Sequence, residues 1–409
     1  MSNDWIFKTN VYEVNLRQYT VEGTINAFGE HLHRLKDMGV ETLWFMPLTP
    51  ISQKNKKGTL GSYYACSNYT AVSQEFGTLD DFRSLVQKAH NLGLTVIIDW
   101  VANHTGWDHV WTAEHPEWYK KDENGQFKRA SGMDDIIELD FSQAAVRSAM
   151  INAMEWWIEH TDIDGFRCDL AFWVELKFWK EAKSELQKRK PLLWLGELDM
   201  LDSPEFMQVF DAAYTWKWMH SCEKYYKEEI SFNELMTVLE NYSHSVGLKC
   251  WFTSNHDENS WNGTEYEKYG EMAELLAVFS CTWPGVPLIY SGQELPNRKR
   301  LQFFEKDVIA WNDSCALHQF YRNLLHLRKD FCALNAQAPV ERVFSNVDKL
   351  LAFKRTDASS EILILLNFSD QAIPLKISDN PEWIDRDSGE LLTGEVQLKK
   401  FGWKILVKK

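Results

Sequence analysis

The feature that most constrains the fold is an alternation of short apolar segments with longer helical patterns, which runs from residue 11 to residue 292. Near-continuous apolar strands joined by helices predict a parallel sheet, and eight such strands that close on themselves form a (β/α)8 (TIM) barrel. The strand candidates are 11–16, 41–47, 94–99, the run that ends at Asp169, 192–197, about 210–214, 249–255 and 287–292. We therefore predict an α/β fold whose barrel occupies residues 1–335.

Capping residues mark where two of the predicted helices begin and end. Thr24 can cap a helix over 25–38, in which apolar residues recur at helical spacing, and Gly39 ends it. The arrangement repeats between Thr78 and Gly93. The repeat supports strand–helix units rather than a bundle of helices.

Two regions depart from this pattern. Residues 105–140 are rich in Trp, His, Gly and charge without a clear period, and they follow the third strand. A barrel commonly carries an inserted subdomain at such a place, over its active site. Residues 336–409 alternate as strands with turn residues between them, which predicts a small antiparallel, β-sandwich-like domain.

Composition limits the partners of this chain. The formal net charge of −15 argues against nucleic acid and against an anionic membrane surface. No run of 18 apolar residues is present, and the first residues lack the pattern of a secretory signal. Seven scattered Cys without a CxxC pair favour reduced thiols. We expect a cytoplasmic chain whose ligand is neutral, and the oligomeric state is not predicted.

Three acids directly follow three of the predicted strands. They are Asp169 in G-F-R-C-D, Glu197 in L-G-E and Asp257 in N-H-D. Because the carboxyl ends of barrel strands meet at one face, we expect these acids to share a pocket. Neighbouring carboxyl groups in unlike environments can keep one protonated and one ionised, as cleavage of a glycosidic bond requires.

These motifs resemble those of the α-amylase family of glycoside hydrolases (family 13, retaining), in the family's order and over nearly the whole chain. The segments that carry the resemblance are 61–69 (G-S-Y-Y-A-C-S-N-Y), 99–104 (D-W-V-A-N-H), 165–169, 196–197, 254–257 (S-N-H-D) and 285–294 (G-V-P-L-I-Y-S-G-Q-E). Six matches in the correct order and spacing make chance a poor explanation.

The resemblance implies a role for each acid. Asp169 matches the nucleophile, Glu197 the general acid and then base, and Asp257 the carboxylate that stabilises the transition state. Arg167 precedes Asp169 by two residues on the same strand face, so we expect it to lower the pKa of Asp169. The apolar W-L-G before Glu197 should favour the protonated form of that acid by desolvation.

The resemblance also implies residues that bind the sugar. His104 and His256 match two histidines that hydrogen-bond its hydroxyls, and Tyr64 matches a tyrosine that stacks on it. Tyr63 is a rival for that tyrosine, because it is the adjacent aromatic residue. Asp99 is expected to orient Arg167, which we group with the substrate-binding residues.

Calcium is a separate expectation from the resemblance. Asn103, with Glu138 or Asp140, matches residues that bind a structural Ca²⁺, a hard cation that takes oxygen ligands. The chemistry itself needs no cofactor. The family's usual Lys-His after the nucleophile is replaced by Phe-Trp at 172–173 here. The specificity on the leaving-group side of the site is therefore not predicted. Candidate stacking residues there, each equally explained by core packing, are Trp107, Trp111, Trp118 and Trp173.

The resulting functional prediction is retaining hydrolysis of α-glucosidic bonds, with α-1,4 bonds of maltodextrins or starch-type glucans as the expected substrate. A transglycosylase or isomerase of the same fold is the alternative, because water and a sugar hydroxyl compete for one intermediate. A non-catalytic carbohydrate-binding protein is more distant, because all three acids are present. A metal-dependent hydrolase could use His104, His256 and Asp257, but no metal-ligand cluster is apparent.

Overall fold

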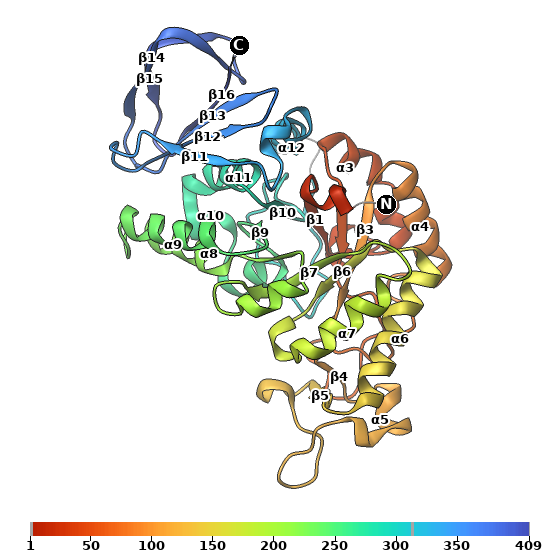
Figure 1. Ribbon diagram of the computed structural model, residues 1–409. Coiled ribbons are helices and arrows are strands. Elements are labelled where there is room, and N and C mark those ends of the chain that lie inside the picture. Colours follow the sequence, from red (N-terminus) through yellow and green to blue (C-terminus); the bar gives the residue numbers. More distant parts are fainter. Residues whose placement is uncertain (1–2, 312–314, 409) are drawn as a thin grey trace.

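The computed structural model describes residues 3–311 and 315–408, and parallel strands close into a barrel at its centre (Figure 1). Around the barrel the strand order is β1-β2-β3-β6-β7-β8-β9-β10, and β10 pairs with β1. The predicted barrel is therefore confirmed. Its strands are β1 (Val11–Val14), β2 (Thr42–Phe45), β3 (Thr95–Trp100), β6 (Gly165–Cys168), β7 (Leu193–Asp199), β8 (Ala212–Tyr214), β9 (Leu248–Trp251) and β10 (Val286–Tyr290).

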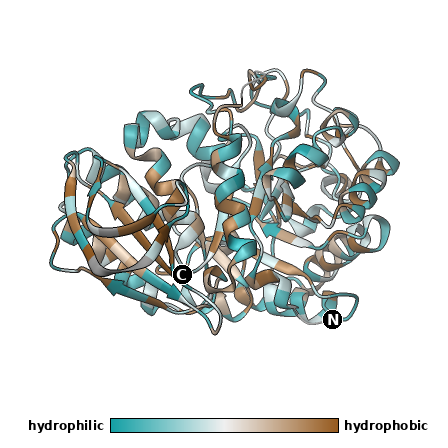
Figure 2. Cartoon of the chain, turned by 90° about the horizontal axis from the view of Figure 1, so that it is seen from above, coloured by the Kyte–Doolittle hydropathy of each residue, from teal (hydrophilic) through white to brown (hydrophobic). Residues whose placement is uncertain are grey.

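Burial on both faces explains why these strands are apolar. Every residue of β1, β2, β6, β7, β8 and β10 is buried. Figure 2 shows the hydrophobic strands enclosed by helices whose outer surfaces are hydrophilic. The parallel register places Asp99 beside Arg167, and Cys168 beside Gly196. The acids that follow β6 and end β7 therefore lie at the same end of the barrel.

The helices surround the barrel, and one predicted helix is divided in two. The peptide N–H groups of Glu30 and His31 donate to carbonyls three residues earlier, which tightens the chain and ends α2 before α3 begins. The helices are α1 (Leu16–Tyr19), α2 (Ile25–Gly29), α3 (Leu32–Met38), α4 (Leu79–Asn91), α5 (Val110–Glu114), α6 (Ala144–Thr161), α7 (Leu176–Leu186), α8 (Trp216–Tyr226), α9 (Phe232–His244), α10 (Glu265–Tyr269), α11 (Ala273–Thr282) and α12 (His318–Asp330). No helix in these described ranges is long and apolar enough to cross a membrane.

Shorter helical turns connect these elements. One of them, η6, is a π-helix directly after Asp257. The turns are η1 (Asn3–Phe7), η2 (Pro116–Trp118), η3 (Ala130–Gly132), η4 (Ala171–Trp173), η5 (Pro204–Gln208), η6 (Glu258–Asn262), η7 (Gly270–Met272) and η8 (Cys332–Leu334).

An inserted segment follows β3, at the bottom of Figure 1. It contains the antiparallel pair β4 (His104–Gly106) and β5 (Ile136–Glu138), with α5 between them. The pair returns the chain to the barrel, where α6 leads to β6. This antiparallel pair of strands places His104 at the barrel mouth.

The C-terminal strands form one antiparallel sheet, at the upper left of Figure 1. Its order is β11-β12-β13-β16-β14-β15, so it is a single six-stranded sheet rather than the two sheets of a sandwich. Leu350, Leu375 and Leu398, from three of its strands, share a small core of their own. The strands are β11 (Val340–Val343), β12 (Leu350–Thr356), β13 (Glu361–Asn367), β14 (Ile373–Asp385), β15 (Leu391–Leu398) and β16 (Trp403–Lys408).

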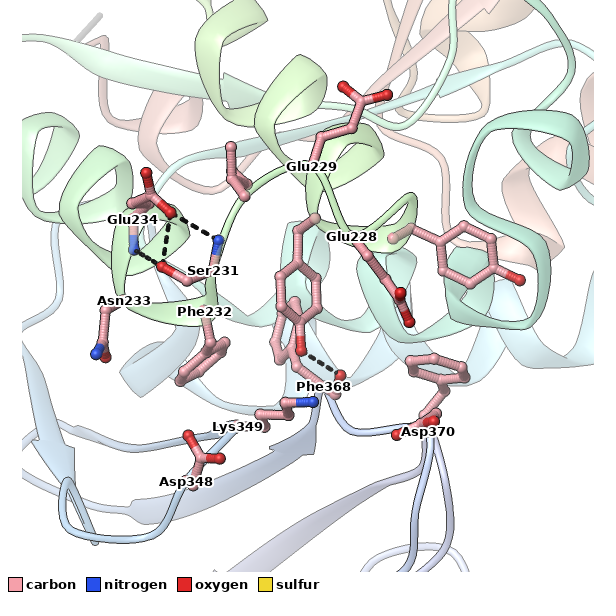
Figure 3. A pocket seen from close by; sticks show the side chains of 14 residues that line it. Glu228, Glu229, Ser231, Phe232, Asn233, Glu234, Asp348, Lys349, Phe368 and Asp370 are labelled. Carbon is pink, nitrogen blue, oxygen red and sulfur yellow. Dashed lines mark hydrogen bonds between the residues drawn. The ribbon is translucent and has the colours of Figure 1, made fainter.

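Aromatic side chains pack this sheet against the barrel helices. The rings of Trp283 and Phe353 lie 4.8 Å apart, and those of Phe232 and Phe368 lie 5.6 Å apart. A cavity of about 570 Å³ lies at this junction, and the Tyr225 hydroxyl donates to the Phe368 carbonyl beside it. Figure 3 shows the side chains that line it. Residues of α8 and α9 line one side of this cavity and Phe368 and Phe401 line the other, so it belongs to the junction between the domains.

Arg355 on β12 joins the sheet to the barrel through backbone carbonyl groups. Its buried guanidinium donates to the carbonyls of Thr282 (2.5 Å), Asn335 (2.7 Å), Ala338 (3.2 Å) and Pro339 (3.2 Å). Thr282 is the last residue of α11, so the side chain satisfies a helix-end carbonyl that has no partner within the helix.

We predict that Arg355→Met lowers the free energy of unfolding by at least about 2–3 kcal/mol, because each buried carbonyl left without a donor costs about 1–3 kcal/mol. Urea unfolding followed by circular dichroism measures this loss. Lys354→Met is the matched control, since Lys354 is half-exposed and its ion pair with Glu361 contributes about 1 kcal/mol or less. Equal stability of the two variants would contradict the proposed anchoring role.

Candidate active site

The predicted acids converge on one cavity at the carboxyl ends of the barrel strands. The cavity has a volume of about 370 Å³, in the usual range for small-ligand sites. The sequence had predicted five of its lining residues, namely Tyr64, His104, Asp169, Glu197 and Asp257. The structure therefore brings together acids that are far apart in the chain: Asp169 and Asp257 are separated by 88 positions.

Arg167 is the centre of the charged network beneath this cavity. Its Nη1 lies 2.9 and 3.1 Å from the two carboxylate oxygens of Asp99, and 3.2 Å from one oxygen of Asp169. Its Nη2 lies 2.9 Å from Oε2 of Glu197. The guanidinium is fully buried and lies 4.8 Å from the centre of the Trp44 ring. One cation thus contacts three carboxylates.

Arg167 lowers the pKa of Asp169 as predicted, but the net shift of that pKa is upward. Burial and the neighbouring Glu197 carboxylate raise the pKa of Asp169 well above its usual value, and Arg167 only partly opposes them. Burial is the largest cause of the rise, and Arg167 also makes its shorter contacts to Asp99 and Glu197 rather than to Asp169. Burial likewise raises the pKa of Asp99 to about 6. Because three buried carboxylates share one guanidinium, the cluster favours retaining a proton.

The backbone after Asp169 holds Glu197. The peptide N–H of Leu170 donates to Oε2 of Glu197 at 2.7 Å. Leu170 has φ 37° and ψ 50°, a left-handed conformation that is strained for a residue with a branched side chain. This strain directs the N–H toward the carboxylate. The sequence analysis missed Leu170, because no local signal in the sequence predicts its conformation.

Asp257 belongs to a second chain of contacts, which runs through His256 to Glu13. Nδ1 of His256 lies 2.5 Å from Oε1 of Glu13, and Nε2 lies 3.3 Å from Oδ2 of Asp257. Burial works against the charged form of His256, but Asp257 and Glu13 together raise its pKa well above the usual value. Although burial opposes ionisation of Asp257, His256 outweighs it and lowers the pKa of Asp257. The sequence analysis missed Glu13, although a charged residue within the apolar V-Y-E-V segment was a usable signal.

The three acids differ in how far they open to solvent. The side chain of Asp257 is 42% exposed, against 8% for Asp169 and 5% for Glu197. Asp257 is therefore the most solvent-exposed of the three acids.

Tyr64, rather than Tyr63, lines the cavity. The Tyr64 hydroxyl donates to Asp99 at 3.0 Å and accepts from Nε2 of His256 at 2.7 Å, which is consistent with a charged histidine. Its ring is stacked on the His256 ring at 5.4 Å. Tyr63 is buried behind it, and its hydroxyl donates to Asn15.

His104 presents a neutral imidazole to the cavity. Burial lowers the pKa of His104 to about 4. The side-chain amide of Asn103 lies 3.3 Å from Nδ1 and can donate to it, which assigns the ring proton to Nε2. In the described part of the chain, Nε2 has no hydrogen-bond partner of good geometry.

The proposed calcium ligands are engaged in other contacts. Glu138 forms ion pairs with Lys120 at 3.3 Å and Lys128 at 3.1 Å, and Asp140 accepts from the Ser142 hydroxyl. Two ammonium groups on one carboxylate do not fit a hard dication at the same place. Across residues 3–311 and 315–408, no group of three His, Cys, Asp or Glu side chains is arranged to hold a metal. The calcium site stays a prediction, and no step below depends on it.

The aromatic lining differs from the one the sequence suggested. Trp261, Phe303 and Phe304 line the cavity. The four candidate tryptophans, Trp107, Trp111, Trp118 and Trp173, are not among its described lining residues. Trp111 and Trp118 instead pack against each other within the inserted segment, with ring centres 5.1 Å apart.

Two relatives match most of this chain. α-Amylase MalA of Haloarcula japonica is 26% identical over 94% of this chain and 59% of that protein. A cyclomaltodextrinase of Geobacillus thermopakistaniensis is 23% identical over 91% of this chain and 66% of its own length. The chain thus spans less than two thirds of these two relatives.

Two solved structures align with this chain over almost the whole length of each protein. An α-amylase from Lactobacillus plantarum matches with a TM-score of 0.88 and 25% identity, over 100% of each chain. The maltogenic α-amylase AmyB of Thermotoga neapolitana matches with a TM-score of 0.89 and 27% identity, over 98% of this chain and 99% of that one. The family model described as "Alpha amylase, catalytic domain" matches residues 6–124 and 112–330. This chain therefore belongs to the α-amylase family.

Proposed function

We propose that this chain hydrolyses α-1,4-glucosidic bonds in maltodextrins or starch-type glucans with retention of anomeric configuration. The observation that carries the proposal is the arrangement of Asp169, Glu197 and Asp257 around one cavity, with Arg167 beneath the first two. The names of the relatives, which include α-amylases and cyclomaltodextrinases, support a glucan as substrate.

In the first step, Glu197 donates its proton to the glycosidic oxygen as the bond from that oxygen to the anomeric carbon breaks. A carboxylate oxygen of Asp169 forms a bond to the same carbon, which gives a covalent glycosyl-enzyme and a free sugar hydroxyl. In the second step, Glu197 takes a proton from water while the water oxygen displaces Asp169. The two inversions restore the original configuration.

The proton of the buried cluster must reside on Glu197 when attack occurs. Asp169 then carries the negative charge, and its contact with Nη1 of Arg167 stabilises that charge. Ionised Asp257 can hold sugar hydroxyls, and charged His256 keeps it ionised. The excess of carboxylates favours the positive charge that develops on the sugar ring. Nε2 of His104 supplies a further hydrogen-bond donor.

Product analysis on maltoheptaose, pullulan and sucrose tests the substrate and the type of reaction. We expect shorter maltooligosaccharides from maltoheptaose. Longer oligosaccharides from maltoheptaose, or an isomer formed from sucrose, would favour the transglycosylase or isomerase instead.

We predict that the first product released from an α-linked substrate is the α-anomer, because two successive inversions retain configuration. Proton NMR of fresh product, recorded before mutarotation, gives the answer. Release of the β-anomer would exclude Asp169 as the nucleophile of a double displacement.

We predict that Asp169→Asn abolishes turnover on every substrate, whereas Glu197→Gln distinguishes between substrates. For maltooligosaccharides, Glu197→Gln should lower kcat/KM about 10²–10⁴-fold, the usual contribution of a general acid. Aryl glycosides with good leaving groups need little protonation, so the loss in formation of their glycosyl-enzyme should be much smaller. Burst-phase kinetics measures this step, and exposed Glu205→Gln is the control. Equal losses on both substrate types would contradict the role of Glu197.

We predict that Asp99→Asn moves the acid limb of the kcat/KM profile to lower pH. Asp169 must be ionised to attack, so activity is lost as the pH falls through the raised pKa of Asp169. The Asp99 charge contributes to that rise, and its removal also lets Arg167 interact more strongly with Asp169. Both effects act in the same direction. An acid limb that stays in place or moves to higher pH would refute this account of the cluster.

A further inference from the structure

Trp261 lies at the mouth of the cavity with much of its side chain uncovered. It is 52% exposed, which is unusual for a tryptophan of this chain, and it lines the same cavity as the three acids. It belongs to the π-helix η6, which begins directly after Asp257. Such turns are rare and concentrate at functional sites, which makes an accidental exposure less plausible.

Several contacts fix the π-helix that carries Trp261. The Asn259 side chain donates to the Lys299 carbonyl at 3.1 Å and accepts from the Leu301 peptide N–H at 2.9 Å. Glu258 forms a buried ion pair with Lys268. At the other end of the turn, the Asn262 side chain donates to Oε1 of Glu258 at 3.1 Å. Since both ends of the turn are held, the position of the indole is built into the fold.

Three rings form an aromatic wall along one side of the cavity: Tyr64, Phe303 and Trp261. The Tyr64 and Phe303 rings are stacked 6.2 Å apart, and Phe303 and Trp261 lie 5.4 Å apart with a tilt of 36°. The ion pair of Lys57 with Asp135, at 2.7 Å, also borders the cavity. An exposed ring within a polar-rimmed cavity is typical of a ligand-binding surface.

The chemistry of this wall suits a neutral sugar. An aromatic face packs against the C–H groups of a pyranose, while the polar groups around the cavity can take its hydroxyls. The Trp261 side chain also helps to lower the pKa of Asp257, which links the ring to the catalytic acids. Because Tyr64 is expected to stack on the sugar that is cleaved, Trp261 is available for a neighbouring unit.

We propose that Trp261 is a specificity-determining residue that stacks on a second glucose unit, adjacent to the cleaved one, and thereby selects linear glucan chains over single glucosides. This inference rests on the proposed function, because it assumes that the cavity binds an α-glucan. The interaction of Trp261 with Asp257 allows a different reading, in which Trp261 only orients that acid. The two readings differ in which substitution affects binding and in whether the effect depends on chain length.

Isothermal titration in a Glu197→Gln background, with maltose, maltotriose and maltohexaose, measures binding without turnover. We expect Trp261→Ala to raise Kd for maltohexaose about tenfold, the upper range of a single aromatic contact. Trp261→Phe keeps an apolar ring and loses the N–H group, so it should retain most of the affinity. Trp118→Ala, which removes a ring that stacks on His115 outside the cavity, is the matched control and should leave Kd unchanged.

In the otherwise unchanged protein, the loss of kcat/KM for Trp261→Ala should be larger for maltohexaose than for an aryl glucoside. Two results would overturn the inference. One is an unchanged Kd for maltohexaose in Trp261→Ala. The other is an equal loss of kcat/KM for Trp261→Ala and Trp261→Phe on every substrate, which a role in orienting Asp257 alone would produce.

The outcomes separate this inference from the proposed function. Hydrolysis that persists in Asp169→Asn would refute the proposed mechanism, whereas the titrations report on Trp261 whatever the catalytic residues do. Absence of any maltooligosaccharide binding to the Glu197→Gln protein would refute both. Thermal melting of each variant identifies a loss that is due to unfolding.

Discussion

The buried charge of Arg167 constrains the arrangement of the whole barrel mouth. A guanidinium removed from water is tolerated only if anions surround it, and here the anions come from β3, β7 and the residue after β6. They can reach it only in the observed parallel register, which places Asp99 beside Arg167. A slip of one residue would turn these side chains to the other face of their strands and leave the cation unpaired. The strand register that pairs Arg167 is therefore the same register that assembles the site.

The same network explains how several carboxyl groups can be buried close together in one site. Charges of one sign outnumber the other around Arg167, so part of the electrostatic cost of burial is relieved by a bound proton. The adjacent contacts of His256 with Glu13 and Asp257 form a second group in which positive and negative charges are more evenly matched. The two neighbouring groups differ in electrostatic balance, and the pKa of Asp169 is raised while that of Asp257 is lowered within one cavity.

Local sequence patterns were sufficient to locate the barrel strands and the acids that follow them, because both depend on residues close together in the chain. The direction of the pKa shift of Asp169 was not predictable in this way, since it depends on how deeply the folded chain buries that carboxyl group and on how close it brings Glu197. Trp261 and Leu170 were missed because a π-helix and a left-handed residue are set by tertiary contacts. The single C-terminal sheet likewise depends on how distant strands pair, which alternation of apolar residues does not specify.

The anchoring of Arg355 at the end of α11 links the C-terminal sheet to the closure of the barrel. The chain passes from α11 into β10, the strand that joins β9 to β1 and completes the ring. Loosening the sheet would free the helix end that leads into this closing strand. We therefore expect the two parts to melt in a single cooperative transition rather than as independent folding units. The C-terminal domain thus stabilises the place where the barrel closes, although none of its described residues takes part in the predicted chemistry.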